Sequence, residues 1–152
     1  MFQKYLALFS KQNLLEKAFR RTVKMIEFDR EMFEASVQVL RHSDESDMPF
    51  DIYEKDKALN KYEREVRRNV LTHLAVVGKG DIVAGLTLVS IVIDVERIGD
   101  YTKNIADLAR DHPKRLEAGR HEKALAEIEN KITERFTGFA KIVLVSALLL
   151  KK

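Results

Sequence analysis

The stretch 81–110 constrains the fold more than any other part of the chain, because it contains no proline and repeats apolar residues with helical spacing. The repeats fall at Ile82, Leu86, Val89 and Ile93. Steps of four, three and four residues predict a long helix with one apolar face. The next positions of this face are Glu96 and Asp100, which project from the same side of a helix because they lie four residues apart.

Glu96 and Asp100 therefore stand where we expect this helix to enter the core. A buried, unpaired carboxylate is costly, so the fold must place a metal cation, an arginine or lysine, or a hydrogen-bond network beside it. Gly99, directly before Asp100, leaves room for the close approach of another backbone or of a bound ion. These three residues mark the centre of a candidate site.

The composition favours an all-α protein and excludes several classes of site. The 152 residues suffice for one domain, and 45% hydrophobic and 34% charged residues with only two prolines suit long amphipathic helices. The chain has no cysteine, hence no disulfide, thiolate metal site or cysteine nucleophile. A net charge of +3 with interleaved signs argues against nucleic acid and slightly favours an acidic or membrane-proximal partner. The longest apolar run, 142–150, is far shorter than the roughly 20 residues of a transmembrane helix.

Four helices are expected in an antiparallel up-and-down bundle, over residues 14–40, 52–77, 81–110 and after a charged linker at 114–123. Residues 1–13 suggest a short helical lead-in, and Asp51 is expected to cap the second helix. The stripe of the first helix is interrupted at Asp29 and Arg30. The core positions expected in the second helix are Leu59, Val66, Val70, Leu74 and Val77.

The short turn at 78–80 makes the second and third helices antiparallel neighbours, so the start of one lies beside the end of the other. Asp56, Asn60 and Glu63 should therefore face Glu96 and Asp100. Converging oxygen donors of this kind form hard-cation or carboxylate-bridged metal sites. A salt-bridge network is the open alternative, with the arginines at positions 64, 67, 68 and 97 as partners.

Other polar residues carry weaker signals. The four histidines form no metal motif, and His73 is interpreted as a satisfied residue at the core boundary. No serine lies in a nucleophile elbow, and no glycine-rich phosphate loop is present in the sequence. Four basic residues of the second helix are interpreted as a solvated face, with a partner surface as the lesser alternative: Lys61, Arg64, Arg67 and Arg68.

The sequence Glu-Arg-Ile-Gly-Asp at 96–100, followed by Asn-Ile-Ala at 104–106, resembles the signature of the PhoU family of phosphate-uptake regulators. Asp81-Ile82 occupies the place of that family's Asp-Leu-Arg. Asp56, Asn60 and Glu63 match its acid, asparagine and glutamate on the preceding helix. The resemblance covers residues 14–112, which correspond to one three-helix repeat.

The resemblance implies an all-helical protein, usually of two tandem three-helix repeats, that binds metal ions through Glu/Asp-x-x-x-Asp motifs. The expected ligands are Glu96 and Asp100 on the third helix and Asp56 and Asn60 on the second. The expected metal is an iron or zinc cluster, with magnesium as a further candidate. The implied function is a non-catalytic regulator, cytoplasmic or peripheral at the inner face of the membrane, that links a phosphate ABC-transporter ATPase to a sensor histidine kinase.

Two other functions stay open at this point. The runner-up is a structural helical accessory module of a phosphate or other ion transporter, in which the carboxylates serve only the fold. An enzyme is the third option and would require a general base near a pocket, for which the acidic cluster is the sole candidate in the sequence.

The sequence also departs from the family pattern. Val83 stands where the family often has arginine, Tyr101 where histidine is frequent, and Asn60 is a neutral ligand. We expect residues 1–113 to form the repeat and 114–152 to contribute a fourth helix, the start of an incomplete second repeat without its metal motif. The apolar face of this helix then requires another subunit, most simply in a homodimer, unless the chain is truncated.

Overall fold

The computed structural model describes residues 14–45, 47–77, 79–112 and 114–149. Four long helices occupy them: α2 (Leu14–His42), α3 (Ile52–Val77), α4 (Ile82–Asp111) and α5 (Glu122–Leu149). Short 3-10 turns at Lys79–Asp81 and Gly119–His121 precede α4 and α5. The predicted all-α fold is confirmed, whereas the lead-in expected at 1–13 lies outside the described residues.

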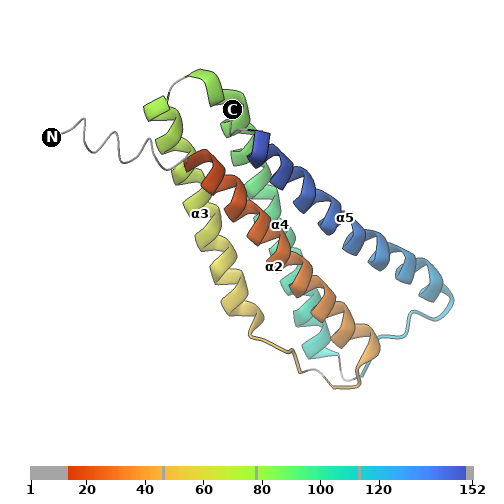
Figure 1. Ribbon diagram of the computed structural model, residues 1–152. Coiled ribbons are helices and arrows are strands. Elements are labelled where there is room, and N and C mark those ends of the chain that lie inside the picture. The colour runs from red at the N-terminus through yellow and green to blue at the C-terminus, as the bar shows by residue number, and fades with distance from the viewer. Residues whose placement is uncertain (1–13, 46, 78, 113, 150–152) are drawn as a thin grey trace.

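The helices form the expected up-and-down bundle, with α2 in contact with each of the other three (Figure 1). α3 and α4 pack against each other as antiparallel neighbours, so α2, α3 and α4 form a three-helix unit. Among the long helices, α5 packs extensively against α2 alone. Within the described residues, no helix therefore lies between one side of α5 and the adjoining side of α4.

Local sequence signals place the helix starts. Asp51 caps α3 as expected, because its side chain accepts hydrogen bonds from the backbone N–H groups of Tyr53 (2.9 Å) and Glu54 (3.1 Å). Asp81 precedes α4 but forms no side-chain cap. Its carboxylate instead pairs with the buried His73, at 2.7 Å from Nε2. The interpretation of His73 as a satisfied boundary residue is confirmed.

The predicted core of α3 is correct at Leu59, Val66 and Val70, which are fully buried. Leu74 packs against the core from a partly buried position, but Val77 is exposed. Val77 is the last residue of α3, at the turn that leads into α4.

The predicted apolar face of α4 is wrong in its register. Ile82 and Leu86 are exposed, and the buried stripe consists of other residues: Gly85, Leu88, Val92, Val95, Gly99, Thr102, Ala106 and Ala109. The first half of α4 is apolar on several sides, so its periodicity does not select one face, and packing against α2 and α3 decides. Glu96 and Asp100 consequently lie beside the buried stripe rather than within it.

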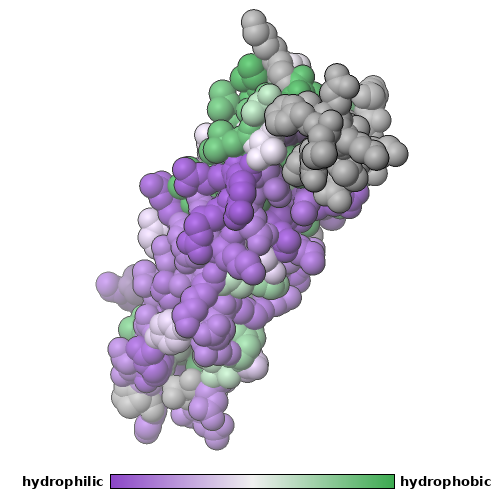
Figure 2. Space-filling model, turned by 90° about the vertical axis from the view of Figure 1, so that its left-hand side faces the viewer, coloured by the Kyte–Doolittle hydropathy of each residue, from purple (hydrophilic) through white to green (hydrophobic). Residues whose placement is uncertain are grey.

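The surface on the α3 side of the molecule is mostly hydrophilic, apart from the end that carries the α3–α4 turn (Figure 2). Apolar side chains exposed near that turn include Leu71, Val76, Val77, Ile82, Val83 and Leu86. Within the described residues, no helix combines the length and the apolar character that crossing a bilayer requires.

Candidate functional site

The α3–α4 interface brings together Asp56 from the start of α3 and Asp100 from the second half of α4. The ammonium group of Lys103 lies between them, 3.0 Å from Oδ1 of Asp56 and 2.8 Å from Oδ1 of Asp100. Lys103 is one helical turn beyond Asp100, so the two side chains share a face of α4. The acids predicted to face each other across the helices therefore do so, joined by a lysine.

Glu96 lies one turn before Asp100 in the same acidic environment. Burial is the main cause that raises the pKa of Glu96, followed by the negative charges of Asp100, Glu63 and Asp56, while Lys103 opposes them. In the described part of the chain, Glu96 forms no hydrogen bond or ion pair. The site thus holds more negative charge than its lysine neutralises.

The arginines considered as alternative partners of Glu96 are engaged elsewhere or exposed. Arg97 pairs with Asp94 at 3.5 Å, and Arg67 pairs with Glu63 at 2.8 Å. All four basic residues at 61, 64, 67 and 68 are exposed, as the interpretation of a solvated face requires. The cation that enters the cluster is therefore Lys103, which is not among the arginines expected from the sequence.

Asn60 lies in α3 one turn after Asp56 and is partly buried. Its Nδ2 donates a hydrogen bond to the backbone carbonyl oxygen of Asp56, at 3.1 Å. This bond fixes the amide along its own helix. The remaining expected ligand is thus positioned beside the cluster by α3 itself.

A fifth carboxylate, Asp29 of α2, lies fully buried, with 0% of its surface exposed. Neither of its carboxyl oxygens has a hydrogen-bond partner within the described residues. Burial, followed by the negative charge of Glu96, raises the pKa of Asp29 from 3.8 to about 9. Asp29 is therefore protonated at neutral pH, and its carboxyl group is an unused polar group in the core next to the acidic cluster.

Gly99 brings Asp29 and the acidic cluster close together. A Cβ atom at this position would lie 2.9 Å from Oδ1 of Asp29 and 2.5 Å from Cδ1 of Leu59. Any larger residue at this crossing of α2, α3 and α4 would force the side chains of Leu59 and Asp29 to shift. The close approach expected at Gly99 is present, but side chains make it rather than another backbone.

The chemical type of the donors in the cluster suits a hard cation, but their present positions do not. Carboxylates from α3 and α4 and the amide of Asn60 supply oxygen ligands, and the unpartnered Asp29 lies beneath them. However, no three acidic or histidine side chains in the described ranges converge closely enough to hold a metal ion. Lys103 occupies the space between Asp56 and Asp100, so a metal ion requires rearrangement of side chains.

Two residues of the cluster were missed or misread in the sequence. Asp29 interrupts the apolar stripe by its polarity, yet it lies three residues after Ile26 and four before Phe33, on the buried face itself. Lys103 lies three residues after Asp100 and seven after Glu96, a spacing that places all three on one side of a helix. This spacing in the sequence indicates that Lys103 belongs to the cluster.

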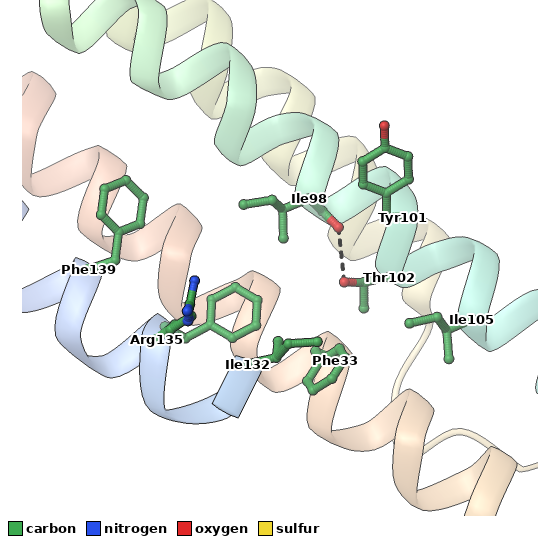
Figure 3. Close-up of a pocket in the computed structure, with 9 residues that line it drawn as sticks. Phe33, Ile98, Tyr101, Thr102, Ile105, Ile132, Arg135 and Phe139 are labelled. Carbon is green, nitrogen blue, oxygen red and sulfur yellow. Dashed lines mark hydrogen bonds between the residues drawn. The ribbon is translucent and has the colours of Figure 1, made fainter. Parts of the chain in front are cut away.

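A separate apolar groove of about 420 Å³ lies between α4 and α5 and is also bordered by α2 (Figure 3). Phe33 contributes from α2, Ile98, Tyr101 and Ile105 from α4, and Ile132 and Phe139 from α5. Thr102 also borders the groove, with its hydroxyl bound to the carbonyl oxygen of Ile98 at 3.0 Å. The groove contains few polar groups and is distinct from the acidic cluster.

Comparison with known proteins identifies the region that contains the cluster. The family model described as the PhoU domain matches residues 22–109, more than half of the chain. The chain is 27% identical over 108 residues to the phosphate-specific transport system accessory protein PhoU homolog 1 of Thermotoga maritima. This alignment covers 62% of the chain and 45% of that relative, so the chain spans less than half of the relative's length. No solved structure matches. The match over α2, α3 and α4 nevertheless shows the family, and the chain belongs to the PhoU family.

Proposed function

We propose that this protein is a metal-binding, non-catalytic regulator of phosphate transport and of phosphate-responsive signalling. The observation that carries the proposal is the acidic cluster of α3 and α4, which lies inside the matched PhoU domain. The name of the Thermotoga relative, a phosphate transport accessory protein, also supports a role in phosphate transport. The chain would act in the cytoplasm or at the inner face of the membrane, with a transporter ATPase and a sensor kinase as partners.

The proposed metal ligands are Glu96, Asp100, Asp56 and Asn60. A bound cation, as an iron or zinc cluster or magnesium, would supply positive charge among carboxylates whose repulsion adds to burial in raising the pKa of Glu96. It would also join α3 to α4 near their crossing with α2. The role assigned to these residues is to bind a cation and fix the two helices.

The second candidate is a structural accessory module, and the Lys103 bridge favours it. An ammonium group that joins Asp56 and Asp100 already links α3 to α4 without any metal. In that case the carboxylates stabilise the bundle only. The two candidates differ in metal content, which is measurable.

The first test replaces Glu96 by alanine and Asp100 by asparagine together. We expect the double variant to lose its bound metal in elemental analysis of protein purified without a metal-affinity tag, because two carboxylate ligands are gone. Helical circular dichroism should remain, since both side chains lie beside the buried stripe. An Asp94→Asn variant, in which an exposed carboxylate of α4 is removed, is the matched control. Full metal content in the double variant would contradict the assignment.

The second test concerns partner binding through the exposed basic face of α3. We expect the Arg64→Glu and Arg68→Glu double variant to bind a phosphate-transporter ATPase or sensor kinase more weakly, because exposed charges accelerate encounter with an acidic surface. The variant should fold, since exposed charge changes alter stability by about 0.5 kcal/mol or less. Pull-downs at low and high salt measure the effect. Recovery of neither partner, with unchanged phosphate-responsive expression after gene deletion, would leave the structural module standing.

The proposal includes a homodimer. Exposed apolar residues of α5, Ile128 and Ile142, continue the line of Ile132 and Phe139 that forms one wall of the apolar groove. A surface of this kind normally marks an interface. A second copy is the proposed occupant.

A further inference from the structure

We propose that Lys103 is a built-in competitor of the cation at the acidic cluster, and that a divalent cation binds only when the ammonium group leaves Asp56 and Asp100. This inference rests on the proposed metal-binding function. It assigns to Lys103 a role in setting the affinity of the site rather than in ligating the metal.

The position of the ammonium group supports the competition. Lys103 Nζ contacts one carboxyl oxygen from each helix, at 3.0 Å on α3 and 2.8 Å on α4. These two oxygens belong to proposed metal ligands, and a cation that joins them must occupy the same space. A divalent cation and this ammonium group therefore exclude each other.

An independent observation shows that one lysine does not satisfy the site. The carboxyl group of Asp29 is completely buried and has no partner among the described residues. It approaches Gly99, between Glu96 and Asp100, from the α2 side. A buried polar group without a partner is rare in native proteins and calls for an explanation such as an ion. The carboxyl group of Asp29 thus leaves unused oxygen atoms on the α2 side of the cluster.

The lysine is suited to leave. Its side chain is 22% exposed and carries its charge on a flexible four-carbon stem. Asp100 is more exposed, at 46%, so solvent reaches the contact that must break. Rotation of this stem can therefore carry the ammonium group from the carboxylates into water.

The experiment measures Mn²⁺ binding to the full chain by isothermal titration and by the electron paramagnetic resonance of the bound ion. Lys103→Met removes the competing charge and keeps the length of the side chain. We expect it to bind Mn²⁺ at least tenfold more tightly than the unaltered protein. Lys103→Arg should bind no more tightly than the unaltered protein, because a guanidinium group can also bridge both carboxylates. The matched control is Lys131→Met, which makes the same charge change at an exposed position of α5.

Thermal unfolding provides a second measurement. Without metal, Lys103→Met should unfold at a lower temperature, because its carboxylates repel each other, and Mn²⁺ should restore the loss. Destabilisation without recovery in Mn²⁺ would show a purely structural lysine and overturn the inference. Equal Mn²⁺ affinity of the unaltered protein and Lys103→Met would also overturn it while leaving the metal function intact. If neither protein binds Mn²⁺, Fe²⁺ or Zn²⁺, the metal function itself fails together with the inference.

Discussion

Asp29 is the residue whose environment departs most from what its side chain prefers. Aspartate side chains are almost never buried without a partner, yet the carboxyl group of Asp29 lies in the core with both oxygens unpaired in the described structure. Its pKa of about 9 means that burial keeps it protonated, with the charge of Glu96 as a second cause. Burial of this carboxyl group therefore lowers the stability of the fold by an amount that depends on pH.

The direction of this dependence follows from the two states. The unfolded chain loses the Asp29 proton near 3.8, whereas the folded chain holds it to about 9. The contribution of this proton to the free energy of unfolding is complete below pH 3.8. It falls as the pH rises from 3.8 to about 9, and it is lost above about pH 9.

We therefore expect Asp29→Asn, which cannot titrate, to gain stability relative to the unaltered protein between pH 5 and pH 8. The gain should grow by up to about 1.4 kcal/mol per pH unit. Urea unfolding in the presence of a chelator measures it. The exposed Asp47→Asn is the matched control and should follow the unaltered protein. Parallel curves for Asp29→Asn and the unaltered protein would show that Asp29 is not protonated in the fold.

At the scale of helices, a buried arginine of α2 binds the linker and the first turns of α5. The side chain of Arg41, at the end of α2, is 2% exposed. It binds the carboxylates of Glu122 and Glu129 and donates to the carbonyl oxygen of Leu116, at 2.7 Å for the last. The backbone N–H of Leu116 also bonds to the carbonyl oxygen of Leu40, at 2.7 Å. The linker and the first turns of α5 are thus held on α2.

Arg41→Met should destabilise the fold by about 2–4 kcal/mol, because Glu129 and the Leu116 carbonyl lose their partner in a partly buried site. The loss should be concentrated at the start of α5, where hydrogen exchange of residues 114–125 is expected to become faster. Arg20→Met, which removes an exposed arginine paired with Glu16, is the control and should change stability by about 0.5 kcal/mol or less. Unchanged exchange at 114–125 would contradict a specific role in attaching α5.

At the scale of the whole molecule, the described helices leave two regions of apolar surface exposed. α5 buries Phe136, Val143 and Ala147 against α2, but Ile142 on its other side is 66% exposed. The expectation of an uncovered apolar face on the fourth helix is therefore right for one side of the helix and wrong for the other. A second apolar region surrounds the α3–α4 turn (Figure 2). Val83, in the first turn of α4, is exposed in this region.

We expect sedimentation to show a dimer at tens of micromolar, formed through the groove side of α4 and α5. Ile142→Glu should shift it to monomer, because burial of a charge at an apolar interface is unfavourable. Val83→Glu places the same charge in the other apolar region and should leave the dimer intact. A monomer for the unaltered protein, or dissociation by Val83→Glu alone, would contradict this interface.

The sequence by itself determined the helices and their order. α3 begins and ends at the expected residues, 52 and 77, because a capping aspartate and helical periodicity are local properties of the chain. The motif at 96–100 identified the family, and the antiparallel turn correctly placed Asp56 opposite Asp100.

Only the tertiary structure decided which face of α4 is buried, because that helix offers apolar residues in several directions and neighbours remote in sequence select among them. The same contacts buried Asp29 and placed Lys103 between two acids. Whether a charged residue is costly, neutral or paired depends on the surrounding dielectric and on side chains from other helices. The periodicity of a single helix carries no information about that dielectric or about the side chains of other helices.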